Sequence, residues 1–266
     1  MATYTFKSSS SLNSFLFFNE ERSAQYVRDI CDDLVVRTNQ IEPPYDPNKY
    51  ADFFGIVVRE LDILEDGRIF HYGNKQIIIL KKNSPITRKR FTCCHEIVHN
   101  FFSAMEERPF LRGKKQAKGA YSLSLIEENL CNLGATYLLM PHEKFKDIAS
   151  QFKPSWENVK HLASKFIVSP ETLAYHLIDT DSWHCSFARW QSVVLQSGDK
   201  GFRPISYRNS PTINMRFLPG MHVSYTSPIG RAFYKHRPLR EHMKTGEVME
   251  IIPIGENHVF SLVYFP

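Results

Sequence analysis

The sequence predicts an α+β protein, with helices in its first two thirds and short strands in its last third. Apolar residues recur at helical spacing in several segments between residues 20 and 180. After Trp183 this period is lost, and short β-like runs replace it. The composition, 42% hydrophobic and 23% charged, is ordinary for a globular chain. It excludes a disordered chain, a collagen and a coiled coil.

Local signals place the elements in order. Ser84 and Pro85 are typical of a helix N-cap and first position, and Ser124 with Glu127 forms a capping box. β-branched runs near Asp-Gly and Gly-Asn turns indicate strands. The predicted helices span 20–36, 46–54, 85–105, 124–139 and 141–152, followed by a helix, short turn and helix within 154–180. The predicted strands span 56–58, 76–80, 192–195, 222–225, 248–252 and 259–264.

These elements predict three domains: residues 1–140, a helix-turn-helix module at 141–182, and a separate α+β domain at 183–266. No apolar run reaches the roughly 20 residues that span a bilayer, and the N-terminal residues lack a signal-peptide core. The five cysteines are odd in number and show no CxxC spacing. We therefore expect a reduced, cytoplasmic protein with no membrane partner.

The charge is uneven along the chain. Eight Lys and Arg residues and a single acid lie between Phe202 and Lys244, a charge of +7 in a chain of net charge +5. A general nucleic-acid coat is therefore not supported, whereas a basic C-terminal patch is. The segment Arg231–Arg240 mixes cations with aromatic rings, which suits nucleic acid or an acidic ligand. A solvated helix face explains the same pattern and is the favoured interpretation.

The residues His95, Glu96 and His99 form an HExxH motif on the helix predicted from Pro85. Histidines four residues apart lie one above the other on a helix, so both imidazoles can reach one metal ion. Glu96 lies beside that ion, where it can take a proton from water. A polar, solvent-facing patch on an amphipathic helix would produce the same motif.

Zinc requires a third protein ligand, with a fourth position left for water. Glu127 and Glu128 open the helix predicted at 124–139. Either carboxylate could instead stabilise the helix dipole as a first-turn acid. We assign the capping role to Glu127 and the metal to Glu128.

Two motifs at compatible spacing resemble the ImmA/IrrE family of metallopeptidases. Arg88–His99 reads RKRFTCCHEIVH, and Glu128–Pro141 reads ENLCNLGATYLLMP. The resemblance covers about residues 20–150 and implies a zincin-like domain. It also implies that His95, His99 and Glu128 bind the metal and that Glu96 is the base. The family often has Gly where this chain has Val98, and we expect only a change in packing there.

The resemblance extends to the order of domains in IrrE-like members, which implies a GAF-like sensor at 183–266. It implies a zinc-dependent endopeptidase, with Mn²⁺ or Fe²⁺ as alternative metals. The implied substrate is a helix-turn-helix (XRE-type) transcriptional repressor, cleaved to derepress a stress or mobile-element response. Two other functions stay open: a non-proteolytic transcription regulator that binds DNA, and a toxin–antitoxin component.

DNA binding by the helix-turn-helix module is possible but not favoured. Its second helix, Ser169–Ile178, contains no Lys or Arg, although phosphate contacts require cations. Ile167 occupies the turn where Gly is usual. A structural or protein-docking module fits these residues better.

Overall fold

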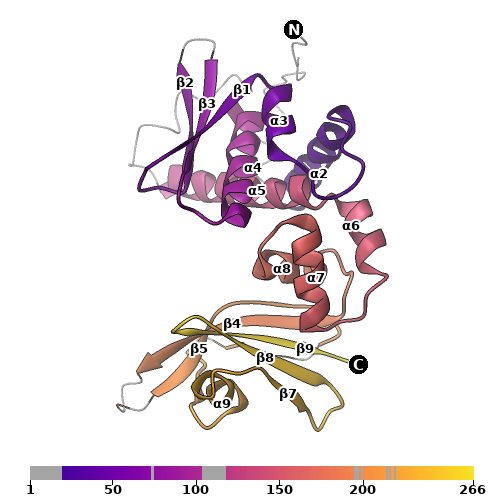
Figure 1. Ribbon diagram of the computed structural model, residues 1–266, viewed down its shortest axis with the longest axis vertical. Helices are drawn as coiled ribbons and strands as arrows, with labels where there is room; N and C mark the ends of the chain where they lie inside the picture. The colour runs from indigo at the N-terminus through magenta and orange to yellow at the C-terminus, as the bar shows by residue number, and fades with distance from the viewer. Residues whose placement is uncertain are drawn as a thin grey trace. The chain divides into compact units, whose positions relative to one another are not determined.

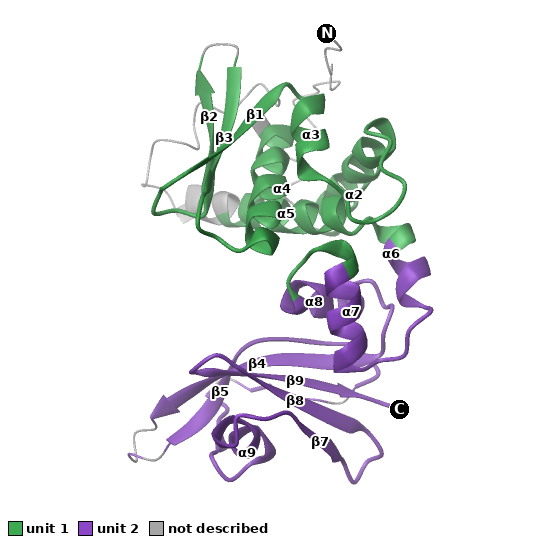
Figure 2. Ribbon diagram, in the orientation of Figure 1, with its two compact units in different colours: residues 1–144, 165–169 green, residues 145–164, 170–266 purple. Residues whose placement is uncertain are grey.

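The computed structural model describes residues 20–72, 75–103, 118–194, 198, 200–213, 215, 217–218 and 220–266. The chain divides into two compact units, which Figure 2 colours separately: residues 1–144 with 165–169, and residues 145–164 with 170–266. Both contain helices and strands, so the α+β class is confirmed. The finer assignments, zincin-like, helix-turn-helix and GAF-like, stay predictions, as do the domain boundaries at 140 and 182.

In the part of the first unit that the structure describes, a three-stranded sheet is combined with four helices and the start of a fifth. Its elements are α2 (Glu20–Arg37), α3 (Pro47–Phe53), β1 (Ile56–Leu61), β2 (Gly67–Tyr72), β3 (Lys75–Lys81), α4 (Ile86–Ser103), α5 (Lys118–Leu139) and the beginning of α6 (His142–Ala149). The strand order is β1-β3-β2, with β1 parallel and β2 antiparallel to β3. Helix α4 packs against β2 and β3, and α5 crosses α4 (Figure 1).

The helices α4 and α5 approach closely at one glycine. A Cβ atom built on Gly134 of α5 would lie 2.8 Å from Cγ2 of Val98 on α4 and 3.0 Å from Cγ1 of Val27 on α2. Val98 is fully buried. Gly134 therefore provides the space that the Val98 side chain occupies. That Val98 changes only the packing stays a prediction.

The second unit is built on a six-stranded antiparallel sheet of order β6-β5-β4-β9-β8-β7. Its elements are the rest of α6, most of α7 (Trp156–Phe166), α8 (Pro170–Asp179), β4 (Cys185–Val194), β5 (Lys200–Asn209), β6 (Val223–Ser224), α9 (Pro228–Tyr234), β7 (Leu239–His242), β8 (Val248–Ile254) and β9 (His258–Tyr264). Figure 1 shows α8 on one face of this sheet and α9 on the other. Alternation along β4 explains both contacts, since Phe187 meets Tyr175 of α8 while Ala188 joins the core under α9.

Most predicted elements are present, and the differences have local causes. Helix α5 begins at Lys118, so the predicted capping box at Ser124 lies inside the helix and Glu127 is not a first-turn acid. Strands β2, β5 and β7 are not among the predicted strands, because each carries polar residues on its exposed side. The predicted helix face at 231–240 is divided between α9, a turn and β7. The predicted end of α4 at Met105 lies outside the described residues.

All five cysteines are free and buried, as a reduced protein requires. Burial raises the pKa of Cys93 and of Cys185 to about 12, so both thiols stay protonated at neutral pH. Within the described residues, no helix is both long and apolar enough to cross a membrane.

Candidate metal centre

Two histidines of α4 and one glutamate of α5 meet at a single point. The Nε2 atoms of His95 and His99 lie 3.1 Å apart. The Glu128 carboxylate faces both rings, with Oε2 at 3.3 Å from Nε2 of His95 and Oε1 at 3.4 Å from Nε2 of His99. The three side chains thus offer one ligand atom each within 4.8 Å of one another. The spacing of the HExxH motif and the crossing of α4 with α5 produce this arrangement.

The separations of these donor atoms fit a small divalent cation. A tetrahedral ion with ligands at roughly 2.0–2.1 Å separates its ligand atoms by about 3.3 Å. The three measured distances, 3.1 to 3.4 Å, fall around that value. Two imidazole nitrogens with one carboxylate oxygen are a donor set that zinc binds in proteins, and iron and manganese accept similar sets.

Two further residues of α5 orient the imidazole rings. Nδ1 of His95 donates to Oδ1 of Asn132 at 3.0 Å, and Nδ1 of His99 donates to Oε1 of Glu127 at 3.3 Å. Because each Nδ1 carries the proton, each Nε2 keeps its lone pair for a ligand. Glu127 therefore contacts His99 and does not cap the helix, which corrects the predicted role.

Glu96 lies on the same helix but points toward the sheet. Its Oε2 accepts a hydrogen bond from the backbone N–H of Ile69 at 2.8 Å. Ile69 is in β2, which is an edge strand among the described strands. The hydrogen bond fixes the carboxylate, and Oε1 has no partner among the residues that the structure describes.

The pKa values of the two histidines are shifted in opposite directions. Burial lowers the pKa of His95, and the neighbouring His99 lowers it further. Burial acts in the same direction on His99. There the hydrogen bond to Glu127 and the charges of Glu128 and Glu96 outweigh it, so the pKa of His99 is raised. The surrounding carboxylates thus create a site that favours positive charge.

The structure brings together His95, His99 and Glu128, which are three of the four predicted site residues. The fourth, Glu96, directly follows His95 on α4. Sequence reasoning missed Asn132 and the backbone of Ile69. Asn132 lies four residues after Glu128, so helical spacing already puts it on the same face of α5. Nothing in the sequence pairs Ile69 with Glu96, because the two meet only through the packing of β2 on α4.

Comparisons with known proteins support a relationship to metallopeptidases. Residues 51–177 match the model of the IrrE N-terminal-like domain, peptidase family M78. The radiation response metalloprotease IrrE of Deinococcus deserti is 30% identical over 103 residues, and that of Deinococcus radiodurans is 27% identical over 103 residues. These alignments include 39% of this chain and span 36% and 31% of the relatives, about a third of their length.

The fold is also similar to a solved structure described as a Mycobacterium tuberculosis transcriptional regulator. The TM-score is 0.61, and the match covers 91% of this chain and 76% of that one at 14% identity. At this identity the likeness concerns the fold alone. The family model, in contrast, includes every residue of the candidate metal centre. Residues 51–177 of this chain therefore match the IrrE N-terminal-like domain family, in agreement with the predicted resemblance.

Proposed function

We propose that the chain is a metal-dependent endopeptidase. The observation that carries this proposal is the meeting of two imidazole nitrogens and one carboxylate at 3.1 to 3.4 Å, with Glu96 beside them. The family match and the name metalloprotease of two relatives support it. His95, His99 and Glu128 would hold the metal, which we expect to be zinc, with manganese or iron as alternatives.

A bound divalent cation would polarise the scissile carbonyl and make water more acidic. The residues of the chain then have separate tasks. Glu96 accepts the proton of the attacking water on its free oxygen and passes it to the leaving amine. The hydrogen bond from Ile69 holds the other oxygen of Glu96, so the carboxylate does not swing away between these two transfers.

A peptide substrate is also supported by the edge strand beside Glu96. An extended peptide can pair with the free side of an exposed strand, and β2 is such a strand among those described. The proposed substrate is a helix-turn-helix (XRE-type) transcriptional repressor, whose cleavage would derepress a stress or mobile-element response. This choice of substrate depends on the resemblance to ImmA/IrrE proteins.

Replacement of Glu96 by Gln tests the mechanism. Glu96→Gln keeps the shape of the side chain and removes the base, and none of the three metal ligands changes. We expect the variant to retain one metal ion per chain by elemental analysis while cleavage of the repressor encoded next to the gene falls by about 10²–10⁴-fold. Glu143→Gln is the matched control, since its side chain is 85% exposed. Wild-type cleavage by Glu96→Gln would contradict the proposed base.

A further inference from the structure

The second unit contains a cavity of about 670 Å³ that takes no part in the metal centre. Segments far apart in the sequence line it: the start of β5, the residues after β6, and α9 with the residue that follows it. The lining side chains relevant here are Lys200, Tyr225, Arg231, Tyr234 and Lys235. Cations and aromatic rings thus converge from three segments, which the pattern of residues 231–240 alone does not indicate.

The two tyrosines keep much of their rings in solvent. Tyr225 is 52% exposed and Tyr234 is 45% exposed. Their ring centroids lie 6.3 Å apart at an interplanar angle of 89°. In this edge-to-face arrangement the rim of one ring covers one face of the other. The exposed fractions show that much of both side chains is still accessible to a ligand. Exposed aromatic faces beside cations are the surface on which nucleic-acid bases stack.

The position of Tyr225 is fixed by its backbone. A Cβ atom built on Gly230 of α9 would lie 2.1 Å from the carbonyl oxygen of Tyr225. Only a glycine allows the chain at Tyr225 to pack so closely on this helix. The two tyrosines are therefore held next to each other by main-chain packing.

Of the three cationic side chains that line this cavity, Arg231 alone forms an ion pair among the described residues. The ammonium groups of Lys200 and Lys235 have no side-chain partner among the residues that the structure describes. Arg231 forms an ion pair with Glu241, which orients its guanidinium and leaves other N–H donors available. Among the described residues, three cations and one acid give the site an excess of positive charge.

We propose that this cavity binds a nucleotide, with its base on a tyrosine ring and its phosphate between Lys200, Arg231 and Lys235. The cavity volume lies within the range of small-ligand sites, roughly 300–1,000 Å³. An acidic peptide would use the cations but would leave the two ring faces unused. The nucleotide is either a free one or one unit of a single-stranded nucleic acid, since both present a base and a phosphate.

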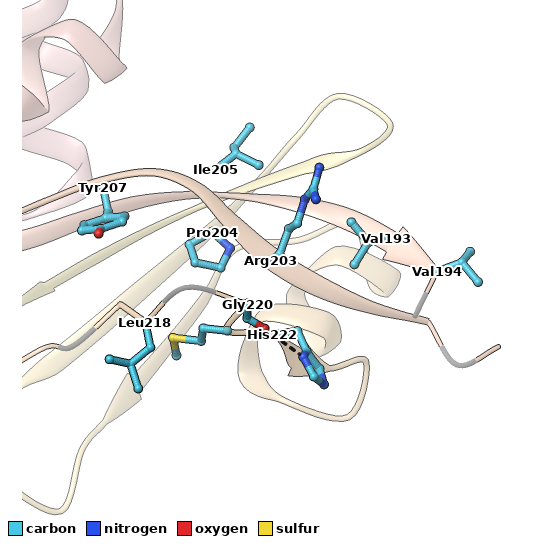
Figure 3. A pocket seen from close by; sticks show the side chains of 10 residues that line it. Val193, Val194, Arg203, Pro204, Ile205, Tyr207, Leu218, Gly220 and His222 are labelled. Carbon is cyan, nitrogen blue, oxygen red and sulfur yellow. Dashed lines mark hydrogen bonds between the residues drawn. The ribbon is translucent and has the colours of Figure 1, made fainter. Parts of the chain in front are cut away.

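A second cavity of the same unit, about 610 Å³, does not share this chemistry (Figure 3). Its lining is mainly apolar, and its side chains come from the end of β4, from β5 and from the segment before β6. Figure 3 shows Arg203 and His222 on different sides of β5, so these two polar groups do not converge on one ligand. Arg203 is nevertheless useful as a control. It is an exposed cation on the same strand as Lys200 and lies outside the proposed nucleotide site.

The proposal can be tested with the full chain and a fluorescein-labelled thymidine 10-mer in anisotropy titrations. We expect a Kd in the range of about 10⁻⁴–10⁻⁶ M that weakens as salt rises. The double variant Lys200→Gln/Lys235→Gln should weaken binding by about tenfold or more, and Tyr234→Leu by about fivefold or more. Arg203→Gln should change binding by less than about twofold, since the site excludes that residue.

Competition identifies the source of the nucleotide. Displacement of the labelled strand by AMP or ATP supports a free nucleotide, whereas displacement only by an unlabelled strand supports a single-stranded nucleic acid. Circular dichroism checks that each variant is folded, and Tyr225→Leu replaces Tyr234→Leu if the latter is not. The proposal is overturned if Arg203→Gln weakens binding as much as the lysine pair, if polyglutamate competes as well as the unlabelled strand, or if neither the 10-mer nor a fluorescent ATP analogue binds.

Discussion

Helices α4 and α8 both carry titratable side chains, but they use them differently. On α4, His95 and His99 direct their Nε2 atoms toward each other and toward Glu128. On α8, Glu171 accepts hydrogen bonds from Arg189 and Ser206 of the sheet in its own unit. The polar side chains of α4 converge on one point, whereas those of α8 form hydrogen bonds within their own unit.

This difference indicates that α4, and not α8, presents polar atoms to a ligand from outside the chain. The Nδ1 atoms of the α4 histidines are held by Asn132 and Glu127, which leaves the Nε2 atoms to share a cation. The polar groups of α8 already have partners, and His176 is almost fully buried. The lack of Lys and Arg on α8 and these internal contacts both favour a structural role for it, as the sequence predicts. DNA binding by this helix stays untested.

The largest expected effect comes from the carboxylate that completes the metal centre. Glu128→Ala removes one of the three proposed ligands and leaves two histidines on a single helix. We expect metal affinity to fall by more than about 100-fold, beyond the range for residues that only orient ligands. Competition with a chromogenic chelator measures this loss. Unchanged affinity would mean that α5 supplies no ligand, and the contrast between α4 and α8 would lose its basis.

A smaller loss is expected at the residue that orients His99. Glu127→Gln keeps a hydrogen-bond acceptor but removes the charge beside the ring. Metal affinity should fall by about 10–100-fold, measured with the same chelator. Equal losses for Glu127→Gln and Glu128→Ala would contradict the assignment of Glu128 alone as the ligand from α5.

The approach of α5 to α4 can be tested at Gly134. A methyl group there would meet Val98 at 2.8 Å, a contact that costs about 1–3 kcal/mol, whereas Ala favours the helix over Gly by about 1 kcal/mol. We expect Gly134→Ala to destabilise the wild type in urea unfolding. In a Val98→Ala background the same change should cost less, because only the contact with Val27 at 3.0 Å remains. Destabilisation of similar size in both backgrounds would show that Val98 is not the neighbour that matters.

The sequence was sufficient to predict that the two histidines of the candidate metal centre meet, because that part of its geometry is local. His95 and His99 lie one turn apart on α4, and helical spacing alone brings their rings together. Glu128 requires one further fact, the packing of α5 on α4. The family resemblance indicated its role, and the structure places it at 3.3 and 3.4 Å from the two rings.

The missed features depend on contacts between distant segments. The bond between Glu96 and Ile69 requires β2 to pair with β3 and to pack on α4, and the alternation in β2 is too weak to predict a strand. Tyr225 and Lys200 join α9 only through the sheet of the second unit. The role of Glu127 was wrong because the helix begins at Lys118, two turns before the apparent capping signal.

The smallest expected effect concerns the polar network of α8. Glu171 has one oxygen on Ser206 and Tyr175 and the other on Arg189, and its side chain is 24% exposed. Glu171→Gln removes the charge that these donors share, so we expect a loss of about 1 kcal/mol in the free energy of unfolding, reduced by solvent screening.

Glu157→Gln is a matched control, because Glu157 occupies the first turn of α7 and is exposed. Both changes remove a first-turn charge that interacts favourably with a helix dipole. The additional loss of unfolding free energy in Glu171→Gln therefore measures the contribution of the hydrogen-bond network. If the two variants unfold at the same urea concentration, the contacts of α8 add nothing to the fold, and its polar groups are as available for a partner as those of α4.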